Sequence, residues 1–121
     1  MFQPFELRVC DGAGRDVRLE VNGAVDMASA PQLLESVLIA ASSSDHQMLV
    51  IVDLADCTFI DSSGVAALMA ASLRVRDHRS HLVITNPPEL IARILDMAGL
   101  YDCLDIRSGW ATQSVYRDTA N

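Results

Sequence analysis

The stretch that most constrains the fold of this chain is residues 49–65. It opens with a short apolar run, Leu-Val-Ile-Val, which is rich in β-branched residues and is bounded by Asp53. This pattern is typical of a strand that is buried on both faces. The polar sequence Asp-Ser-Ser-Gly follows at residues 61–64, and apolar residues then recur at helical spacing. Two adjacent hydroxyls are therefore predicted at a helix N-terminus, where unpaired backbone N–H groups and the positive end of the helix dipole accumulate.

On its chemistry alone, the loop at residues 61–64 has two interpretations. Asp and Ser are preferred N-cap residues, so the loop fits a plain helix cap. Its hydroxyls, Ser62 and Ser63, also fit a loop that faces a ligand or is phosphorylated. Asp26 precedes another predicted helix and also has two interpretations. The plain structural one is a residue whose side chain forms a local turn. These residues by themselves leave both roles open.

Five short segments have the pattern of strands. Residues 5–9 and 17–21 alternate apolar and polar side chains around a Gly-containing turn, which predicts a β-hairpin. We expect Asn22 and Gly23 to end its second strand. Further strands are predicted where apolar segments are separated by helices, and right-handed crossovers should make these strands mutually parallel. They are residues 49–52, 82–85 and 104–106.

Apolar residues at helical spacing predict three main helices. The first should follow Ser29, which matches a capping box with Gln32. The second runs from about 63 to 78. The third should start with Asn86 as its cap and end at Gly99. A short helix over 109–117 and a frayed tail complete the chain. The prediction is one α/β domain over residues 1–121, with a core at about 5–107, a frayed segment at 108–121, a mixed but mostly parallel sheet, an N-terminal β-hairpin and packed helices.

Composition narrows the classes of partner and compartment. The chain has 121 residues, a net charge of −7 and nine basic residues, all of them Arg. Such a charge argues against nucleic acid or an anionic membrane as a partner. There is no apolar run long enough to span a bilayer and no secretory signal pattern, so we expect a cytoplasmic protein. The cysteines, Cys10, Cys57 and Cys103, are far apart and are expected to be buried free thiols without a disulfide or a metal.

Three functions compete for this architecture. A phospho-accepting receiver domain could use Asp53, but it would need a lysine, and the chain contains none. An enzyme with Ser62 or Ser63 as nucleophile would need a nearby base. His78 and His81 are expected far along the following helix or beyond it, and the strand direction places His46 at the other end. The third possibility is a protein-interaction module, in which Ser62 would be modified by a partner kinase. No enzyme activity is expected.

Two groups of residues resemble the STAS-domain anti-sigma factor antagonists, or anti-anti-sigma factors, of bacteria. They are Asp53-Leu54 with residues 57–65, and the later Asp-Met-Ala-Gly-Leu at 96–100. The resemblance covers roughly residues 17–106 and implies the STAS fold. It implies that Ser62, the first serine of the loop, is the phosphorylation site. It also carries over Asp26, because residues 23–26 keep the Gly and Asp of a Gly-Glu-Leu-Asp-like family segment, although the Glu is missing.

The resemblance implies a regulator of transcription that works by partner switching. The unmodified domain would bind an anti-sigma factor with serine kinase activity and free a sigma factor. Phosphorylation would release the domain, and a PP2C-type phosphatase would reset it. ATP would belong to the kinase, so no cofactor is expected. The alternative is a STAS subunit that braces the ATPase of a membrane transporter and is not phosphorylated. The implied partner-binding residues are Asp26, Asp61, Ser62, Ser63 and Gly64.

Overall fold

The structure is a computed structural model that describes residues 4–11, 16–43 and 47–109. Its elements follow one another in the order ββαβαβα, then a short 3-10 helix and a last strand. The predicted sequence of strands and helices is therefore confirmed for the described residues. Residues 110–117 of the helix predicted over 109–117 lie outside them. The bounds are β1 Glu6–Asp11, β2 Asp16–Val25, α1 Ala30–Ser42, β3 Leu49–Ile60, α2 Ser62–Asp77, β4 His81–Thr85, α3 Glu89–Met97, η1 Leu100–Asp102 and β5 Asp105–Arg107.

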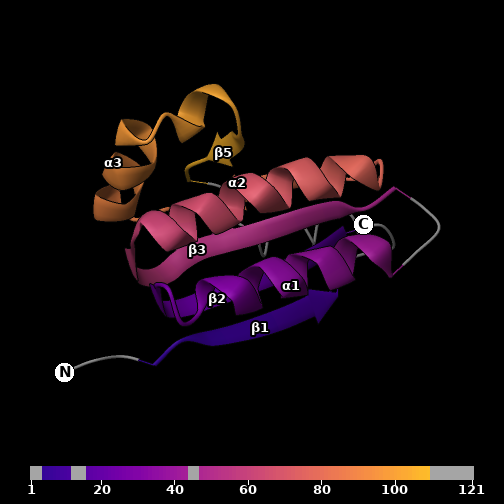
Figure 1. Cartoon of the computed structure of the whole chain (residues 1–121), viewed down its shortest axis with the longest axis horizontal. Coiled ribbons are helices and arrows are strands. Elements are labelled where there is room, and N and C mark those ends of the chain that lie inside the picture. Colours follow the sequence, from indigo (N-terminus) through magenta and orange to yellow (C-terminus); the bar gives the residue numbers. More distant parts are fainter. Residues whose placement is uncertain (1–3, 12–15, 44–46, 110–121) are drawn as a thin grey trace.

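The five strands form one sheet in which spatial order equals chain order, β1-β2-β3-β4-β5. The predicted hairpin is confirmed, because β1 pairs with β2 antiparallel. Every other pair is parallel, as expected for strands that are joined through helices. Figure 1 shows β1, β2 and β3 side by side, with α1 and α2 in front of the sheet. The fold class is thus a mixed, mostly parallel α/β sheet.

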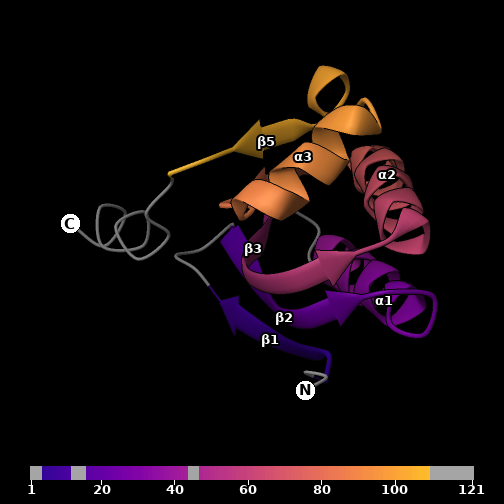
Figure 2. The same cartoon turned by 90° about the vertical axis from the view of Figure 1, so that its left-hand side faces the viewer.

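The main core lies between one face of the sheet and the helices. Leu19, Val52 and Ile84 share one register row on neighbouring strands, and all three are fully buried. The inward side chains of α1 and α2, such as Leu33 and Leu68, belong to the same cluster. Figure 2 shows both helices against this face, with α3 at the end of the sheet. Apolar burial on one face thus holds the carboxyl ends of β2 and β3 in place.

The central strands β2 and β3 are longer than predicted. β2 does not stop at Asn22 but continues to Val25, and β3 does not stop at Asp53 but continues to Ile60. The two extensions pair with each other, with register shifts near Glu20 and Gly23. Those predictions were wrong because pairing between distant segments overrides local turn residues. The shifts are bulge-like irregularities that let the ladder continue.

Of two predicted helix caps, the first has the predicted position without the predicted bonding, and the second was wrong. Ser29 occupies the N-cap position of α1, but its hydroxyl donates to the Ala24 carbonyl oxygen at 2.9 Å rather than capping the helix. Asn86 has φ +56°, and α3 begins only at Glu89. The reason is that a residue before proline disfavours the α conformation, and two prolines follow Asn86. Gly99 does end α3 as predicted, because it adopts the left-handed conformation directly after the helix.

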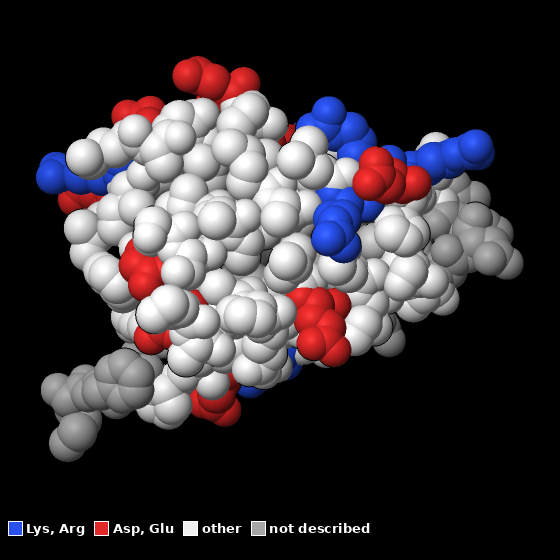
Figure 3. Space-filling view, viewed as in Figure 1, with Lys and Arg blue, Asp and Glu red and all other residues white. Residues whose placement is uncertain are grey.

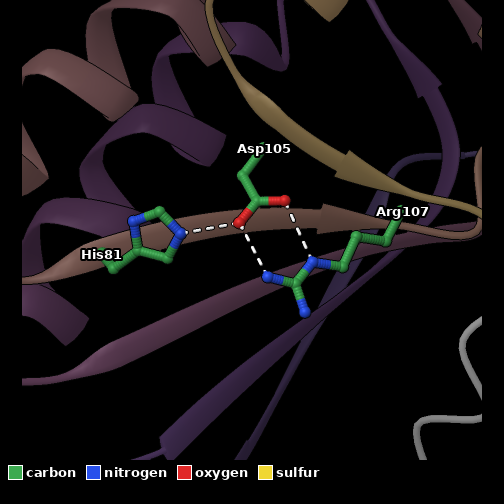
Figure 4. A network of polar contacts seen from close by, with 3 residues as sticks. All are labelled: His81, Asp105 and Arg107. Carbon is green, nitrogen blue, oxygen red and sulfur yellow. Dashed lines mark hydrogen bonds and ion pairs between the residues drawn. The ribbon is translucent and has the colours of Figure 1, made fainter.

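A polar network joins the last two strands. His81 Nε2 lies 2.8 Å from Asp105 Oδ2, across the β4–β5 pair. Arg107 donates from Nε and Nη2 to the same carboxylate, at 3.0 Å for each bond (Figure 4). These bonds lower the pKa of Asp105, first through the hydrogen bond from Arg107 and then through His81. The network therefore anchors a strand of three residues to the sheet.

The three cysteines are free, as predicted, but only one of them is buried. Cys57 is buried, Cys10 is half-buried and Cys103 is exposed. The expectation of three buried thiols was therefore wrong, because Cys103 lies just after η1 at the surface. Burial raises the pKa of the Cys57 thiol and keeps it protonated at neutral pH. Within the described ranges, no helix has both the length and the apolar character needed to span a membrane.

Candidate functional site

The two loops that the sequence singled out meet at one corner of the sheet. Val25 and Ile60 are register partners at the carboxyl ends of the parallel strands β2 and β3. The residues after them, Asp26 and Asp61, therefore leave the sheet side by side. A hydrogen bond of 3.2 Å from the Asp61 N–H to the Val25 carbonyl oxygen ties the two loops together. The carboxyl ends of parallel strands are the usual location of binding loops in α/β folds.

Asp61 is the N-cap of α2. Its Oδ1 accepts from the backbone N–H of Ser63 at 2.8 Å and from that of Gly64 at 3.2 Å. The capping interpretation of the loop is therefore confirmed. The helix begins at Ser62, one residue earlier than predicted, so both serines lie in its first turn. A cap and a modifiable serine are compatible, because Asp61 supplies the cap and leaves the hydroxyls uncommitted.

Gly64 brings the first turn of α2 against the strand ends. A Cβ at this position would lie 2.5 Å from Ile60 Cγ1 and 2.9 Å from the carbonyl oxygen of Val25. Distances this short do not occur for real Cβ atoms, so the close approach requires glycine. The role of Gly64 that the structure shows is packing, and it fixes the position of the neighbouring serines.

Asp26 forms the second loop of the corner through a local turn. Its Oδ1 accepts from the Ala28 N–H at 3.0 Å and from the Ser29 N–H at 3.1 Å. The Ser29 hydroxyl lies 3.2 Å from the same oxygen and accepts from the Asp26 N–H at 2.9 Å. These bonds, with that from the Ser29 N–H the strongest, lower the pKa of Asp26. The turn role is therefore confirmed, and the loop presents a fixed, half-exposed carboxylate.

The adjacent hydroxyls of Ser62 and Ser63 face different surroundings. Ser62 is exposed, and it lines a groove of about 730 Å³ between α2 and α3. Ser63 is half-buried, and it lines a smaller hollow of about 450 Å³ on the α1 side of α2. Among the described residues, neither hydroxyl has a hydrogen-bond partner in the same domain. Of the two, Ser62 is the more accessible to a modifying enzyme.

The described histidines lie far from these serines. His78 is the C-cap of α2, a helix of 16 residues, so it lies about 24 Å along the helix axis from Ser62. His81 follows at the start of β4 and bonds to Asp105. His46 falls outside the described residues. Within the described part of the chain, no group of three His, Cys, Asp or Glu residues is placed to hold a metal ion.

One surface feature escaped the sequence analysis. The spacing of Val65, Leu68, Met69 and Leu73 predicts one apolar face on the second helix. The structure divides this set, because Leu68 is fully buried while Met69 is 36% exposed and Leu73 is 55% exposed. Helical spacing locates apolar side chains on a helix, but it does not say which of them a neighbouring element covers.

The fold and the corner define a small α/β domain that presents an exposed helix N-terminus beside a second polar loop. The family model described as "Mlab, STAS domain" matches residues 10–106 of the chain. The chain therefore belongs to the STAS-domain family. The expected resemblance is confirmed at the level of the family.

Named relatives and solved structures agree with this assignment. The anti-sigma-B factor antagonist of Bacillus subtilis is 28% identical over 92 residues, which cover 75% of this chain and 81% of that protein. That of Staphylococcus epidermidis is 26% identical over 91 residues, with coverage of 75% and 82%. An anti-sigma factor antagonist from Mycobacterium paratuberculosis has a TM-score of 0.77 at 18% identity, over 97% of this chain and 99% of that one. At this identity the structural likeness shows the fold alone.

Proposed function

We propose that this chain is an anti-sigma factor antagonist and that Ser62 is its phosphorylation site. The observation that carries the proposal is the exposure of Ser62 in the first turn of α2, directly beside the Asp26 loop. The names of the relatives support the class of function. Asp26, Asp61, Ser62, Ser63 and Gly64 form the proposed partner-binding corner.

The proposed partner is an anti-sigma factor with serine kinase activity. In the unmodified state the domain binds this partner and a sigma factor is released. Transfer of the γ-phosphoryl group of ATP to the Ser62 hydroxyl ends the interaction, and ADP leaves with the kinase. A PP2C-type phosphatase hydrolyses the phosphoserine and restores the binding state. The chain itself needs no cofactor in this scheme, which operates in the cytoplasm.

The chemistry of the corner explains why a phosphate would act as a switch. A phosphoserine carries roughly −1.5 to −2 charges at neutral pH. Next to Asp61, one pair of like charges about 6 Å apart repels by roughly 3 kcal/mol at an effective dielectric constant of about 20. Asp61 belongs to the same domain, so this repulsion weakens binding only where the partner removes the solvent that screens the pair. A difference of about 2–3 kcal/mol between the bound and the free state would correspond to roughly 30- to 150-fold in affinity. The N-terminus of α2 favours an added negative charge, so the fold itself is expected to tolerate the phosphate.

The proposal is tested by affinity capture from the native cell, followed by phosphorylation with the purified partner and ATP. We expect an anti-sigma factor in the captured material and a single phosphate by intact-mass spectrometry. Ser62→Ala should abolish that phosphate while partner binding persists, and the matched variant Ser63→Ala should retain it. Phosphate on Ser63 would move the site by one residue. Capture of a transporter ATPase, with no phosphate on either serine, would favour the alternative function.

A further inference from the structure

The groove between α2 and α3 is an apolar surface that the fold leaves open beside Ser62. Its wall on α2 contains Ser62, Val65, Ala66 and Met69, which follow the i, i+3, i+4, i+7 spacing of one helix face. Ile94 and Met97 line the facing wall on α3. The groove therefore lies between two helix faces, and Ser62 is at the end where α2 begins.

Three apolar side chains that line the groove are exposed to solvent in the folded domain. Met97 is 87% exposed, Phe59 46% and Met69 36%, and all three line the groove. A contiguous apolar patch of this kind on a small domain marks an interaction site. Two of the three are methionines, whose flexible side chains adapt to the shape of an apolar partner.

The charges around the groove indicate what kind of partner fits it. Asp61 is the only charged residue among the described residues that line the groove, and its carboxylate already caps α2. Figure 3 shows a largely uncharged surface over α2 and α3, with acidic and basic side chains both present along its margins. The chain as a whole carries −7. An occupant with an apolar face therefore complements the nearly uncharged lining, and the net charge of the chain favours a partner of opposite overall charge.

We propose that the α2–α3 groove holds the apolar face of an amphipathic helix from the protein partner, and that the phosphate on Ser62 closes it by desolvation. The inference rests on the proposed function and extends its interface beyond the two loops. A third helix between two facing helix walls is a standard packing arrangement, in which side chains of one helix fill the groove of the others.

A switch that acts by desolvation differs from one that acts by charge repulsion in its dependence on salt. A bound helix would exclude water from the groove mouth, where a phosphoserine dianion would then lie without its hydration shell. Charge repulsion across solvent weakens as salt shortens the Debye length from about 10 Å at 0.1 M to about 3 Å at 1 M. The cost of burying an unpaired dianion does not depend on salt in this way. The effect of phosphorylation should therefore persist at high ionic strength.

The groove is tested with a matched pair of variants on α3. Met97→Glu places a charge in the groove, whereas Leu90→Glu places the same charge on the same helix at a 57% exposed residue outside the groove lining. The probe is the anti-sigma factor identified by capture, titrated into each unphosphorylated variant by calorimetry. We expect Met97→Glu to weaken binding roughly tenfold or more and Leu90→Glu to change it by less than about twofold. Thermal unfolding of both variants checks that the fold is intact.

Each other outcome has a separate meaning. If the partner binds wild type and Met97→Glu equally well, the groove proposal is overturned and the proposed function stands. If no anti-sigma factor binds wild type, both are overturned together. If wild type dimerises in sedimentation experiments and Met97→Glu is monomeric, the groove serves a second copy and the proposal is also overturned.

The loss of affinity on Ser62 phosphorylation should stay within about twofold between roughly 0.1 and 1 M salt. Its disappearance at high salt would overturn the desolvation mechanism.

Discussion

At the scale of single residues, Gly64 sets how closely α2 approaches the strand ends. The nearest atoms to a Cβ at this position include the Val25 carbonyl oxygen, which is also the acceptor for the Asp61 N–H. That oxygen cannot move away without disturbing the hydrogen bond that joins the two loops. We therefore expect Gly64→Ala to lower the free energy of unfolding by about 1–3 kcal/mol in a urea titration.

The intrinsic preference of Ala for helices acts in the opposite direction, by about 1 kcal/mol, so the expected loss is a net effect of the close contact. Ser62→Ala is the matched control, because it lies in the same turn at an exposed position. It should change the free energy of unfolding by no more than about 0.5 kcal/mol. Equal stability of wild type and Gly64→Ala would show that α2 shifts freely away from Val25 and Ile60.

Asp26 supports a second prediction at this scale, on pH. Hydrogen bonds, first from the Ser29 N–H, hold its pKa below the ordinary value of 3.8. A carboxyl group with a lowered folded-state pKa contributes stability above its unfolded pKa and loses it as the pH falls through the folded pKa. The difference in unfolding free energy between wild type and Asp26→Ala should therefore be constant above about pH 5 and shrink toward about pH 2.

Asp26→Asn separates the turn from its charge. The amide keeps an acceptor oxygen for Ala28 and Ser29 but does not titrate, so unfolding of Asp26→Asn should lack the acid-dependent component that wild type shows. The same pair of variants bears on the interface. If the carboxylate contacts the partner, both variants weaken partner binding. Normal binding and phosphorylation of Asp26→Ala would leave the loop with a structural role alone.

Ser62 and Ser63 show what a sequence pattern cannot predict about single residues. The pattern around residues 61–64 located a helix N-terminus with two hydroxyls, and the structure confirms it. It could not distinguish Ser62 from Ser63 by chemistry. Consecutive residues of a helix point about 100° apart, so one hydroxyl faces α3 and the other faces α1. That difference depends on tertiary packing, which a local pattern does not contain.

At the scale of elements, period-2 and helical patterns predicted the hairpin, the parallel strands and the three helices. Both alternating and continuous apolar runs are local consequences of burial, so they can be read from sequence. The ends of β2 and β3 could not be read in this way, since Asn22 and Asp53 are turn-favouring residues that lie within strands. Their conformation is decided by the strand beside them. The helix cap predicted at Asn86 was wrong for a related reason. The two prolines that follow Asn86 move the start of α3 to Glu89.

The β4–β5 network gives a prediction at the same scale. Asp105 accepts from Arg107 and His81, and β5 has only three residues. We expect Asp105→Asn to speed hydrogen exchange of β5 amides roughly 2- to 5-fold, while β2 and β3 amides keep their protection. Glu89→Gln is the control, because it removes a loose, exposed ion pair of 3.9 Å with Arg93. Unchanged exchange in β5 would show that backbone pairing alone anchors the strand.

At the scale of the whole molecule, the fold separates stability from recognition. The fully buried residues lie on the strands and on the inward sides of α1, α2, α3 and η1, whereas Ser62 is exposed. A charge added at Ser62 therefore lies at an exposed position. The proposed phosphate at Ser62 would therefore change binding without unfolding the domain, as a reversible switch requires.

Ser62→Asp tests that separation in one variant. The positive end of the α2 dipole favours a carboxylate in the first turn, and repulsion from Asp61 offsets part of this gain. The melting temperature should therefore stay within about 4 °C of wild type. Binding to the captured anti-sigma factor should weaken at least several-fold, though a carboxylate reproduces only part of the charge of a phosphate. Ser63→Asp is the matched comparison: it places the same charge at a half-buried position facing α1, so it should lower the melting temperature more. A Ser62→Asp variant that lost its cooperative melting transition would mean that phosphorylation acts on the fold itself and not on the interface.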